Sequence, residues 1–324
     1  MFGITEILAI VGGFGALIWG ADRFVAGAAG MARTLNVSPL IIGLVIVGFG
    51  TSAPEMLVAG VAGWEGNTGL AIGNSLGSNI TNIALVLGLT ALLYPLTVHS
   101  DLLKREFPAL FIIMAFVAIL FIDGELGLVD GYLLLAGMIG FVGWMVYLGK
   151  HSTSDDPIEQ EFDEEIPDPL PIGKALFWVA VGLIVLLIGA RAVVWGSVII
   201  AQSFGISDLV IGLTIVAIGT SLPELATTIM SAKKGEHDIA IGNIIGSNMF
   251  NLLGVLGIPA VIHPTAFDNG VLTRDFPVMV LLTIALFLMA RGRKGVNGEI
   301  NRIEGGSLFI AYFSYLGILY YMTT

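Results

Sequence analysis

The chain contains no cysteine and few charged side chains. Only 12% of its 324 residues are Asp, Glu, Lys or Arg, about half the share in an average soluble domain. The missing cysteine excludes disulfides and thiolate metal sites. No basic cluster is larger than Arg291-Gly292-Arg293-Lys294, so we expect no nucleic-acid partner. Hydrophobic residues make up 56% of the chain, and apolar segments long enough for a bilayer recur along it. These features predict an all-α polytopic membrane protein.

The hydropathy pattern predicts ten membrane spans. They run over residues 4–31, 38–63, 68–95, 105–122, 127–149, 173–203, 207–232, 238–263, 274–290 and 304–322. The first segment contains Asp22 and has neither a basic leader nor a small-residue cleavage site, so we expect a retained helix and not a signal peptide. An acidic segment with eight Asp or Glu residues separates two sets of five spans. It predicts a solvated linker, with a calcium-sensing role as the alternative.

The two halves of the chain repeat each other at a constant offset of 169 residues. The clearest pair is Gly50-Thr51-Ser52-Ala53-Pro54-Glu55 and Gly219-Thr220-Ser221-Leu222-Pro223-Glu224. Further matches are Gly73-Asn74 with Gly242-Asn243, Gly77-Ser78-Asn79 with Gly246-Ser247-Asn248, Asn82 with Asn251, and Arg105, Phe107 and Pro108 with Arg274, Phe276 and Pro277. Five spans are an odd number, so the second copy must enter the membrane from the opposite side. Inverted repeats of this kind are typical of transporters, with the site at mid-membrane.

The predicted domains are a first five-helix repeat over 1–149, an acidic linker over 150–172, and a second, inverted repeat over 173–324. Loop charges predict how they are oriented. With the N-terminus outside, only Arg191 and Arg274 of the 14 basic residues fall toward the outside. We therefore expect both termini outside and the linker in the cytoplasm, in a multi-pass protein of the cell (inner) membrane.

Glu55 and Glu224 each lie in the middle of an apolar span. A carboxylate at that depth costs about 2.5–3.5 kcal/mol and needs a compensating partner. The sequence has no Lys or Arg between residues 33 and 104 or between 191 and 233, so neither glutamate has a cationic partner on its own span or on the spans beside it in the sequence. The simplest missing partner is a dissolved metal cation.

Pro54 and Pro223 should break the two spans and leave backbone carbonyls free, because proline clashes with the carbonyl four residues earlier and donates no hydrogen bond. Free carbonyls, hydroxyls and one carboxylate form an all-oxygen set, which Ca²⁺ and Na⁺ prefer. The alternative is a proline kink that only shapes the helix. A kink alone, however, does not require a buried acid beside it in both copies.

The third and eighth spans are expected to add polar ligands. Ser78 and Asn82 share one helix face, as do Ser247 and Asn251, because each pair is spaced by four residues. These four are better candidates than Asn74 or Asn243. The alternative for any one of them is a hydrogen bond between helices.

The doubled string resembles the α-repeats of the calcium/cation antiporter superfamily, most closely its prokaryotic sodium/calcium exchangers, over essentially the whole chain. The resemblance implies ion ligands from both halves. They are Thr51, Ser52, Glu55, Ser78, Asn82, Thr220, Ser221, Glu224, Ser247 and Asn251, with the carbonyls of Gly48 and Ala217. Some relatives have Asp where this chain has Asn251, and an acid there is associated with K⁺ transport. Asn251 therefore argues against K⁺ dependence.

We expect a secondary antiporter, not an enzyme, that exchanges Na⁺ for Ca²⁺ by alternating access and holds no permanently bound cofactor. Two carboxylates and one Ca²⁺ sum to zero charge; with the three Na⁺ that the resemblance implies they sum to +1, so exchange would be electrogenic. A Ca²⁺/H⁺ antiporter is the closest alternative, and a cation channel is a more distant one. A membrane enzyme fits poorly, since no nucleophile–base pair lies in the spans. The oligomeric state stays open, and a monomer is compatible with the pattern.

Overall fold

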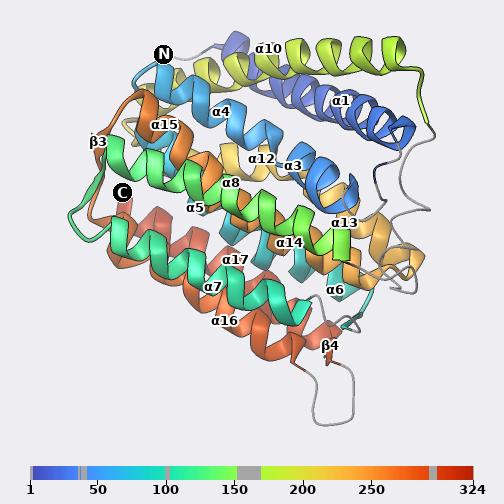
Figure 1. Cartoon of the computed structure of the whole chain (residues 1–324). Helices are drawn as coiled ribbons and strands as arrows, with labels where there is room; N and C mark the ends of the chain where they lie inside the picture. The colour runs from blue at the N-terminus through green and yellow to red at the C-terminus, as the bar shows by residue number, and fades with distance from the viewer. Residues whose placement is uncertain are drawn as a thin grey trace.

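The computed structural model of the chain describes residues 3–35, 37, 42–98, 103–151, 169–291 and 298–323. These ranges are mostly helical (Figure 1). The elements of the first half are α1 (Ile4–Thr34), η1 (Ile42–Val47), α3 (Gly48–Thr51), α4 (Ala53–Trp64), α5 (Thr68–Ile80), η2 (Thr81–Leu87), α6 (Gly88–Leu93), β1 (Leu96–Val98), α7 (Leu103–Leu120), β2 (Glu125–Leu126) and α8 (Leu128–His151). Elements labelled η are π-helical turns. The predicted linker lies mostly outside the described residues.

The second half follows the same order of elements among the described residues, with α11 and η5 in addition. It contains α10 (Ile172–Phe204), α11 (Asp208–Ile211), η3 (Gly212–Val216), α12 (Ala217–Thr220), α13 (Leu222–Lys234), α14 (His237–Phe250), η4 (Asn251–Val255), α15 (Leu256–Ile262), β3 (Thr265–Ala266), η5 (Val271–Asp275), α16 (Phe276–Ala290), β4 (Gly298–Ile300) and α17 (Arg302–Thr323). Two antiparallel strand pairs connect the halves: β1 pairs with β4 and β2 with β3.

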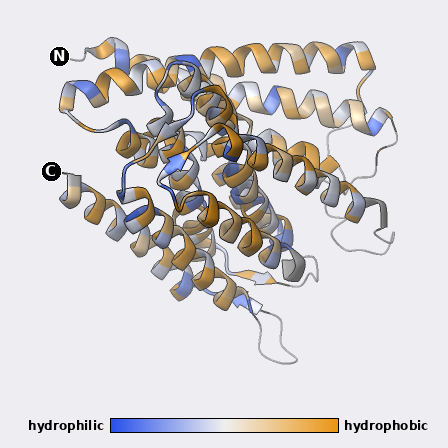
Figure 2. Ribbon diagram, turned by 60° about the vertical axis from the view of Figure 1, so that its left-hand side comes forward, coloured by the Kyte–Doolittle hydropathy of each residue, from blue (hydrophilic) through white to orange (hydrophobic). Residues whose placement is uncertain are grey.

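Seven described helices are long and apolar enough to cross a membrane, and nine spans result if each of two bent helix pairs is one span. The apolar helix at Glu106–Leu120 is shorter. Large side chains on the outer faces are apolar; Val11 is 63% and Ile188 62% exposed. Hydrophobic residues predominate along the long helices in Figure 2. The chain is therefore a multi-pass helical membrane protein.

The two bent pairs lie where the sequence predicts broken helices. The axis bends by 50° between Val45–Thr51 and Ala53–Trp64, and by 43° between Asp208–Thr220 and Leu222–Lys234. Pro54 and Pro223 occupy the first turn of α4 and of α13, where the missing N–H leaves no hydrogen bond unmade. A π-helical turn precedes each bend, at η1 and η3, and such turns weaken the regular backbone ladder.

The centre of the bundle consists of the continuous helices Thr68–Leu93 and His237–Ile262. In their apolar windows 78% and 89% of the residues are buried, against at most 39% in the other five candidate spans. Both central helices contain a π-helical turn, η2 and η4, at equivalent places in the two halves. The polar residues that they carry therefore lie away from lipid.

Helices α1 and α10 form a close antiparallel pair along one side of the bundle (Figure 1). A Cβ added at Gly13 would lie 2.9 Å from the carbonyl oxygen of Gly189, and one at Gly20 would lie 3.1 Å from that of Gly182. Small residues at these positions let the two backbones approach. The pair holds equivalent places in the two halves but runs in opposite directions.

Candidate ion-binding site

The two broken helices place Glu55 and Glu224 at the centre of the protein. Each glutamate lies in the first turn of the helix after the bend, α4 or α13, and each is fully buried. A helix N-terminus carries partial positive charge, which partly offsets a carboxylate placed there. The break thus creates two helix N-termini inside the bundle, each with its own acid.

The two carboxylates lie close together, and each faces hydroxyl groups from the opposite half. Glu55 is near Glu224 and near the hydroxyls of Thr220 and Ser221. Glu224 is in turn near the hydroxyls of Ser247 and Thr51. The repeated strings therefore form one shared site and not two separate ones.

Most of the carboxylate oxygens lack a hydrogen-bond partner. Ser247 Oγ donates to Glu224 Oε1 at 3.3 Å. Glu224 Oε2 and both carboxylate oxygens of Glu55 are buried without a donor among the described residues. The hydroxyls of Ser52 and Ser221 and the amide oxygens Oδ1 of Asn82 and Asn251 are in the same condition. Burying an oxygen without a partner costs about 1–3 kcal/mol, so this group of seven oxygens calls for a ligand that accepts electron pairs.

The chemistry of these oxygens fits a hard cation. They are carboxylate, hydroxyl and amide oxygens, the ligands typical of Ca²⁺ and also suited to Na⁺. The described residues contain no cluster of three or more His, Cys, Asp or Glu that could hold a metal, and the chain has no cysteine. A softer metal such as zinc, which prefers sulfur and nitrogen ligands, therefore finds little support here.

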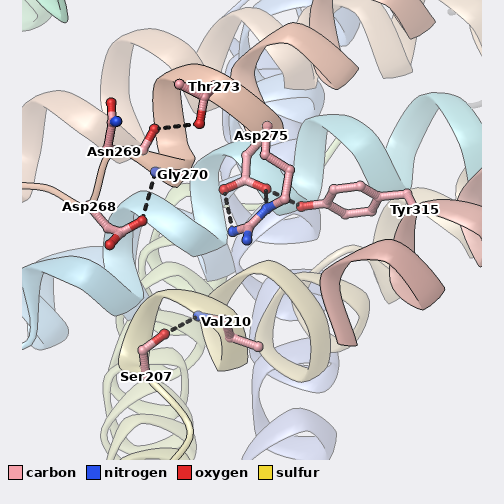
Figure 3. Close-up of polar contacts among 9 residues, drawn as sticks. Ser207, Val210, Asp268, Asn269, Gly270, Thr273, Asp275 and Tyr315 are labelled. Atoms are coloured by element: carbon pink, nitrogen blue, oxygen red, sulfur yellow. Dashed lines mark hydrogen bonds and ion pairs between the residues drawn. The ribbon is translucent and has the colours of Figure 1, made fainter. Parts of the chain in front are cut away.

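Asp275 shows how a buried acid with a structural role differs from these two glutamates. It is fully buried, but Arg274 donates to it from Nε at 2.7 Å and from a terminal nitrogen at 3.0 Å. The hydroxyl of Tyr315 adds a third hydrogen bond at 2.9 Å (Figure 3). The charge of Asp275 is compensated within the protein, whereas Glu55 has only the nearby hydroxyls of Thr220 and Ser221, and neither makes a well-formed hydrogen bond to it.

The threonines beside the glutamates anchor the broken turns. Thr51 donates to the carbonyl of Gly48 at 3.2 Å, and Thr220 donates to the carbonyl of Val216 at 3.0 Å. The carbonyl of Ala217 was expected to be free, but it accepts a hydrogen bond from the backbone N–H of Ser221 at 3.1 Å. Carbonyl and hydroxyl oxygens have two lone pairs, so these groups can still coordinate an ion.

Asn74 connects the central helix to both broken helices. Its Nδ2 donates to the backbone carbonyl of Glu55 at 3.2 Å, and its Oδ1 accepts from Thr220 at 3.1 Å and from Ser78 at 3.4 Å. The amide oxygen of Asn74 is therefore occupied by the hydroxyls of two predicted ligands. The ranking of Ser78 and Asn82 above Asn74 as ion ligands stays a prediction.

Two equivalent interfaces beside the site are not packed alike. In the first, α5 lies tightly on η3 and on α11 before it: a Cβ at Gly77 would meet Leu213 Cα at 2.7 Å, and one at Gly73 would overlap the carbonyl of Leu209. In the second, between α14 and η1, a Cβ at Gly246 would meet no described atom within 4 Å. Gly242, Asn243 and Gly246 are partly exposed, whereas Gly73, Asn74 and Gly77 are buried. Among the described residues, the α5–η3 side of the site is therefore closely packed, and the equivalent residues of α14 on the other side are partly exposed.

Comparison with known proteins identifies the family. The profile described as sodium/calcium exchanger protein matches residues 5–147 and 174–321. The chain belongs to the sodium/calcium exchanger family. A protein of Alkalimonas amylolytica, CaxA, named as a candidate antiporter, is 49% identical over 98% of this chain and 99% of that protein. The inner membrane protein YrbG of Escherichia coli is 40% identical over 95% of this chain and 94% of its own length.

A solved structure of the sodium-calcium exchanger NCX_Mj, soaked with Na⁺ and without Ca²⁺, has a TM-score of 0.67 and 32% sequence identity. The match covers 97% of this chain and 98% of the NCX_Mj chain. Together with the family profile, this structure supports a calcium/cation antiporter activity, and the family is one of membrane transporters. The resemblance inferred from the repeated strings is thereby confirmed.

Among the predicted ligands, the structure brings the hydroxyls of Thr51, Ser78, Thr220, Ser221 and Ser247 near the two glutamates or Asn74. It also connects Asn82 and Asn251 to two asparagines that the sequence did not single out as functional. Asn79 and Asn248 are 1% exposed and hydrogen-bond to Asn251 and Asn82. The available signal was their position in the repeated Gly-Ser-Asn string, but a string does not tell which of two neighbouring asparagines faces an ion.

Proposed function

We propose that this exchanger moves Ca²⁺ against Na⁺ across the cell membrane by alternating access, and that both ions bind in turn at the central site. The observation that carries the proposal is that seven oxygens of the predicted ligand set, three of them from the two glutamates, are buried and unpaired. Oxygens from both halves are present, as a mid-membrane site at a repeat interface requires. The proposed ligand set is the one that the sequence predicts: Gly48, Thr51, Ser52, Glu55, Ser78, Asn82, Ala217, Thr220, Ser221, Glu224, Ser247 and Asn251.

Charge balance supports the choice of ions. Glu55 and Glu224 together carry two negative charges, so one bound Ca²⁺ makes the site neutral and lowers the penalty for holding charge away from water. Three Na⁺ would leave one net positive charge. Each cycle would then move one charge, with a driving force of about 2.3 kcal/mol per 100 mV. Asn251 contributes no third charge, which supports exchange that does not depend on K⁺.

The architecture we propose has ten spans in two inverted repeats. It counts each bent pair as one span and α7 as a short tenth. The antiparallel packing of α1 on α10 supports the inversion, since these helices hold equivalent places in the two halves. With both termini outside and the acidic linker in the cytoplasm, the α5–η3 interface faces outward and the α14–η1 interface faces inward.

The unequal packing of these interfaces supports alternating access over a continuous pore. A channel needs a path open at both ends, whereas among the described residues one side of the site is closely packed and the equivalent residues on the other side are partly exposed. In the proposed orientation the described structure is closed toward the outside. The opposite state would close α14 on η1 and separate α5 from η3.

The test is uptake of radioactive calcium into proteoliposomes that contain the purified protein. An outward Na⁺ gradient should drive uptake, and an inside-negative or inside-positive voltage should change its rate because the exchange moves charge. Uptake driven by an imposed pH gradient in the absence of Na⁺ would instead establish a Ca²⁺/H⁺ antiporter. Calcium flux that needs no counter-ion would overturn antiport altogether.

A further inference from the structure

Four asparagines from the two central helices form a pair of crossed hydrogen bonds beside the site. Asn82 Nδ2 donates to Asn248 Oδ1 at 3.1 Å, and Asn251 Nδ2 donates to Asn79 Oδ1 at 3.0 Å. The two bonds are equivalent, since each joins matching positions of the two halves. Each bond connects one half to the other. Asn79 and Asn82 lie three residues apart on the same helix, and each bonds to a different asparagine of the opposite half.

A further contact of Asn79 explains which way the amides of Asn79 and Asn251 face. Asn79 Nδ2 donates to the backbone carbonyl of Asn248 at 3.3 Å. A backbone carbonyl can only accept, so the nitrogen of Asn79 must face it, and Asn79 Oδ1 must then face Asn251. An oxygen can only accept as well, so Asn251 must present its nitrogen to Asn79. Its own Oδ1 is left buried, without a hydrogen-bond partner, on the other side of the amide.

Asn82 is in the same condition. Its nitrogen is held by Asn248 Oδ1, and its Oδ1 is buried and unpaired. Rotating either amide by half a turn would set two oxygens against each other and would turn an NH₂ group toward the ions. An amide coordinates a cation through its oxygen, and an NH₂ group in that place would repel it.

We propose that Asn79 and Asn248 are positioning residues that hold the amides of Asn251 and Asn82 with their oxygens toward the transported ions. Each acts on the ligand of the opposite half. The inference rests on the proposed function, because it assumes that Asn82 and Asn251 coordinate the ions. It explains why the Gly-Ser-Asn string and the asparagine three residues later occur together in both halves.

The test measures the equilibrium binding of Ca²⁺ to the purified, full-length protein by calorimetry. Asn79→Leu removes the acceptor that holds Asn251 and keeps a side chain of similar size. Loss of a group that orients a metal ligand weakens binding by about 10–100-fold. The same substitution is then made in an Asn251→Ala background, where no amide remains to be oriented, and there it should weaken binding much less.

The matched control places Asn79→Leu in an Asn82→Ala background. Asn82 is the equivalent ligand, but its nitrogen is held by Asn248, so the full effect of Asn79→Leu should persist. Damage to helix packing by Asn79→Leu would weaken binding equally in both backgrounds. Loss of the orientation of the Asn251 amide can weaken binding only in the Asn82→Ala background, where Asn251 is still present. Equal effects in the two backgrounds, or unchanged binding in Asn79→Leu alone, would overturn the proposal.

The mirror-image set keeps the test decisive if Asn79→Leu does not fold. Asn248→Leu should weaken binding in an Asn251→Ala background and much less in an Asn82→Ala background. Glu55→Gln separates this proposal from the proposed function. If the wild-type protein binds Ca²⁺ and Glu55→Gln does not, the site stands whatever the asparagine variants show. If Ca²⁺ binding is absent or independent of Glu55, the proposed function fails, and the positioning role fails with it.

Discussion

Alternating access can be tested with one matched pair of glycines. Gly77 and Gly246 are equivalent residues of the two halves, but they lie in interfaces that differ in packing. A Cβ at Gly77 would lie 2.7 Å from the Cα of Leu213 and 2.8 Å from the Cβ of Ala217, whereas a Cβ at Gly246 would meet no described atom within 4 Å. The perturbation is Gly77→Ala compared with Gly246→Ala.

The magnitude follows from the cost of overpacking. Gly77→Ala pushes a methyl group against backbone in the described state, which costs about 1–3 kcal/mol. The added methyl group of Gly246→Ala meets no described atom within 4 Å here, and alanine favours a helix over glycine by about 1 kcal/mol. In the opposite state, however, α14 must close on η1 as α5 now lies on η3. The added methyl group then meets the same penalty, which shifts the balance of the two states by about 5–150-fold.

We therefore expect Gly246→Ala to unfold at the wild-type temperature or above and yet to exchange Ca²⁺ about 5–150-fold more slowly. Gly77→Ala should unfold at a lower temperature. Thermal unfolding in detergent measures stability, and Na⁺-driven calcium uptake in proteoliposomes measures exchange. The reasoning is refuted if Gly246→Ala exchanges at the wild-type rate, or if both variants lose the same stability.

Four further predictions concern three kinds of substitution and the effect of pH. Glu55→Gln and Glu224→Gln should each abolish Na⁺-driven calcium uptake while the protein stays folded, because one negative charge no longer balances Ca²⁺; near-normal uptake would show that the site is misplaced. Asn251→Asp should make exchange depend on K⁺ or on pH, since a third carboxylate gives the calcium-loaded site a charge of −1; an unaltered cation dependence would count against Asn251 as a ligand. Acidification should weaken the apparent affinity for Ca²⁺ in uptake assays, because protons and Ca²⁺ bind mutually exclusive states of the same carboxylates, and high Ca²⁺ should relieve the inhibition; an effect on the maximal rate alone would contradict a shared site. Tyr315→Phe should lower the stability, measured by thermal unfolding, by about 1–3 kcal/mol because Asp275 loses a buried hydrogen bond, with no change in the Na⁺ or Ca²⁺ dependence of uptake.

Much of the site could be predicted from the sequence because its chemistry does not depend on fine packing. A glutamate in an apolar span without a nearby Lys or Arg needs a partner whatever the helix angles are. Pro54 and Pro223 disturb a helix through local geometry alone, and both helices bend where these prolines begin the next segment. The constant spacing of the two strings placed Ser78, Asn82 and their equivalents in the same region.

Other features depend on contacts between the halves, which no local pattern contains. The pairing of Asn79 with Asn251 is one such feature. Each half has two asparagines three residues apart, and the sequence does not distinguish the one that positions from the one that is positioned. The hydrogen bond to the Ala217 carbonyl is another, because a proline break predicts free carbonyls but not which of them the next turn will use. The span count also stays a proposal, since the apolar part of α7, Glu106–Leu120, is short.

The sequence predicts least well which of the two access states, open to one side of the membrane or to the other, the protein adopts. Gly73 and Gly77 match Gly242 and Gly246, so the repeated sequence favours the same close packing at both interfaces. The two states should therefore be close in energy, as a transporter that must populate both requires. The repeats are not identical, however: Ala217 packs near Gly77, and its equivalent in the other half is Gly48. One extra methyl group in the closed α5–η3 interface favours the described state by about 0.8 kcal/mol. A bias of this size is small against the free energy of binding an ion, so the bound ions, and not the packing, can decide which side of the site is open.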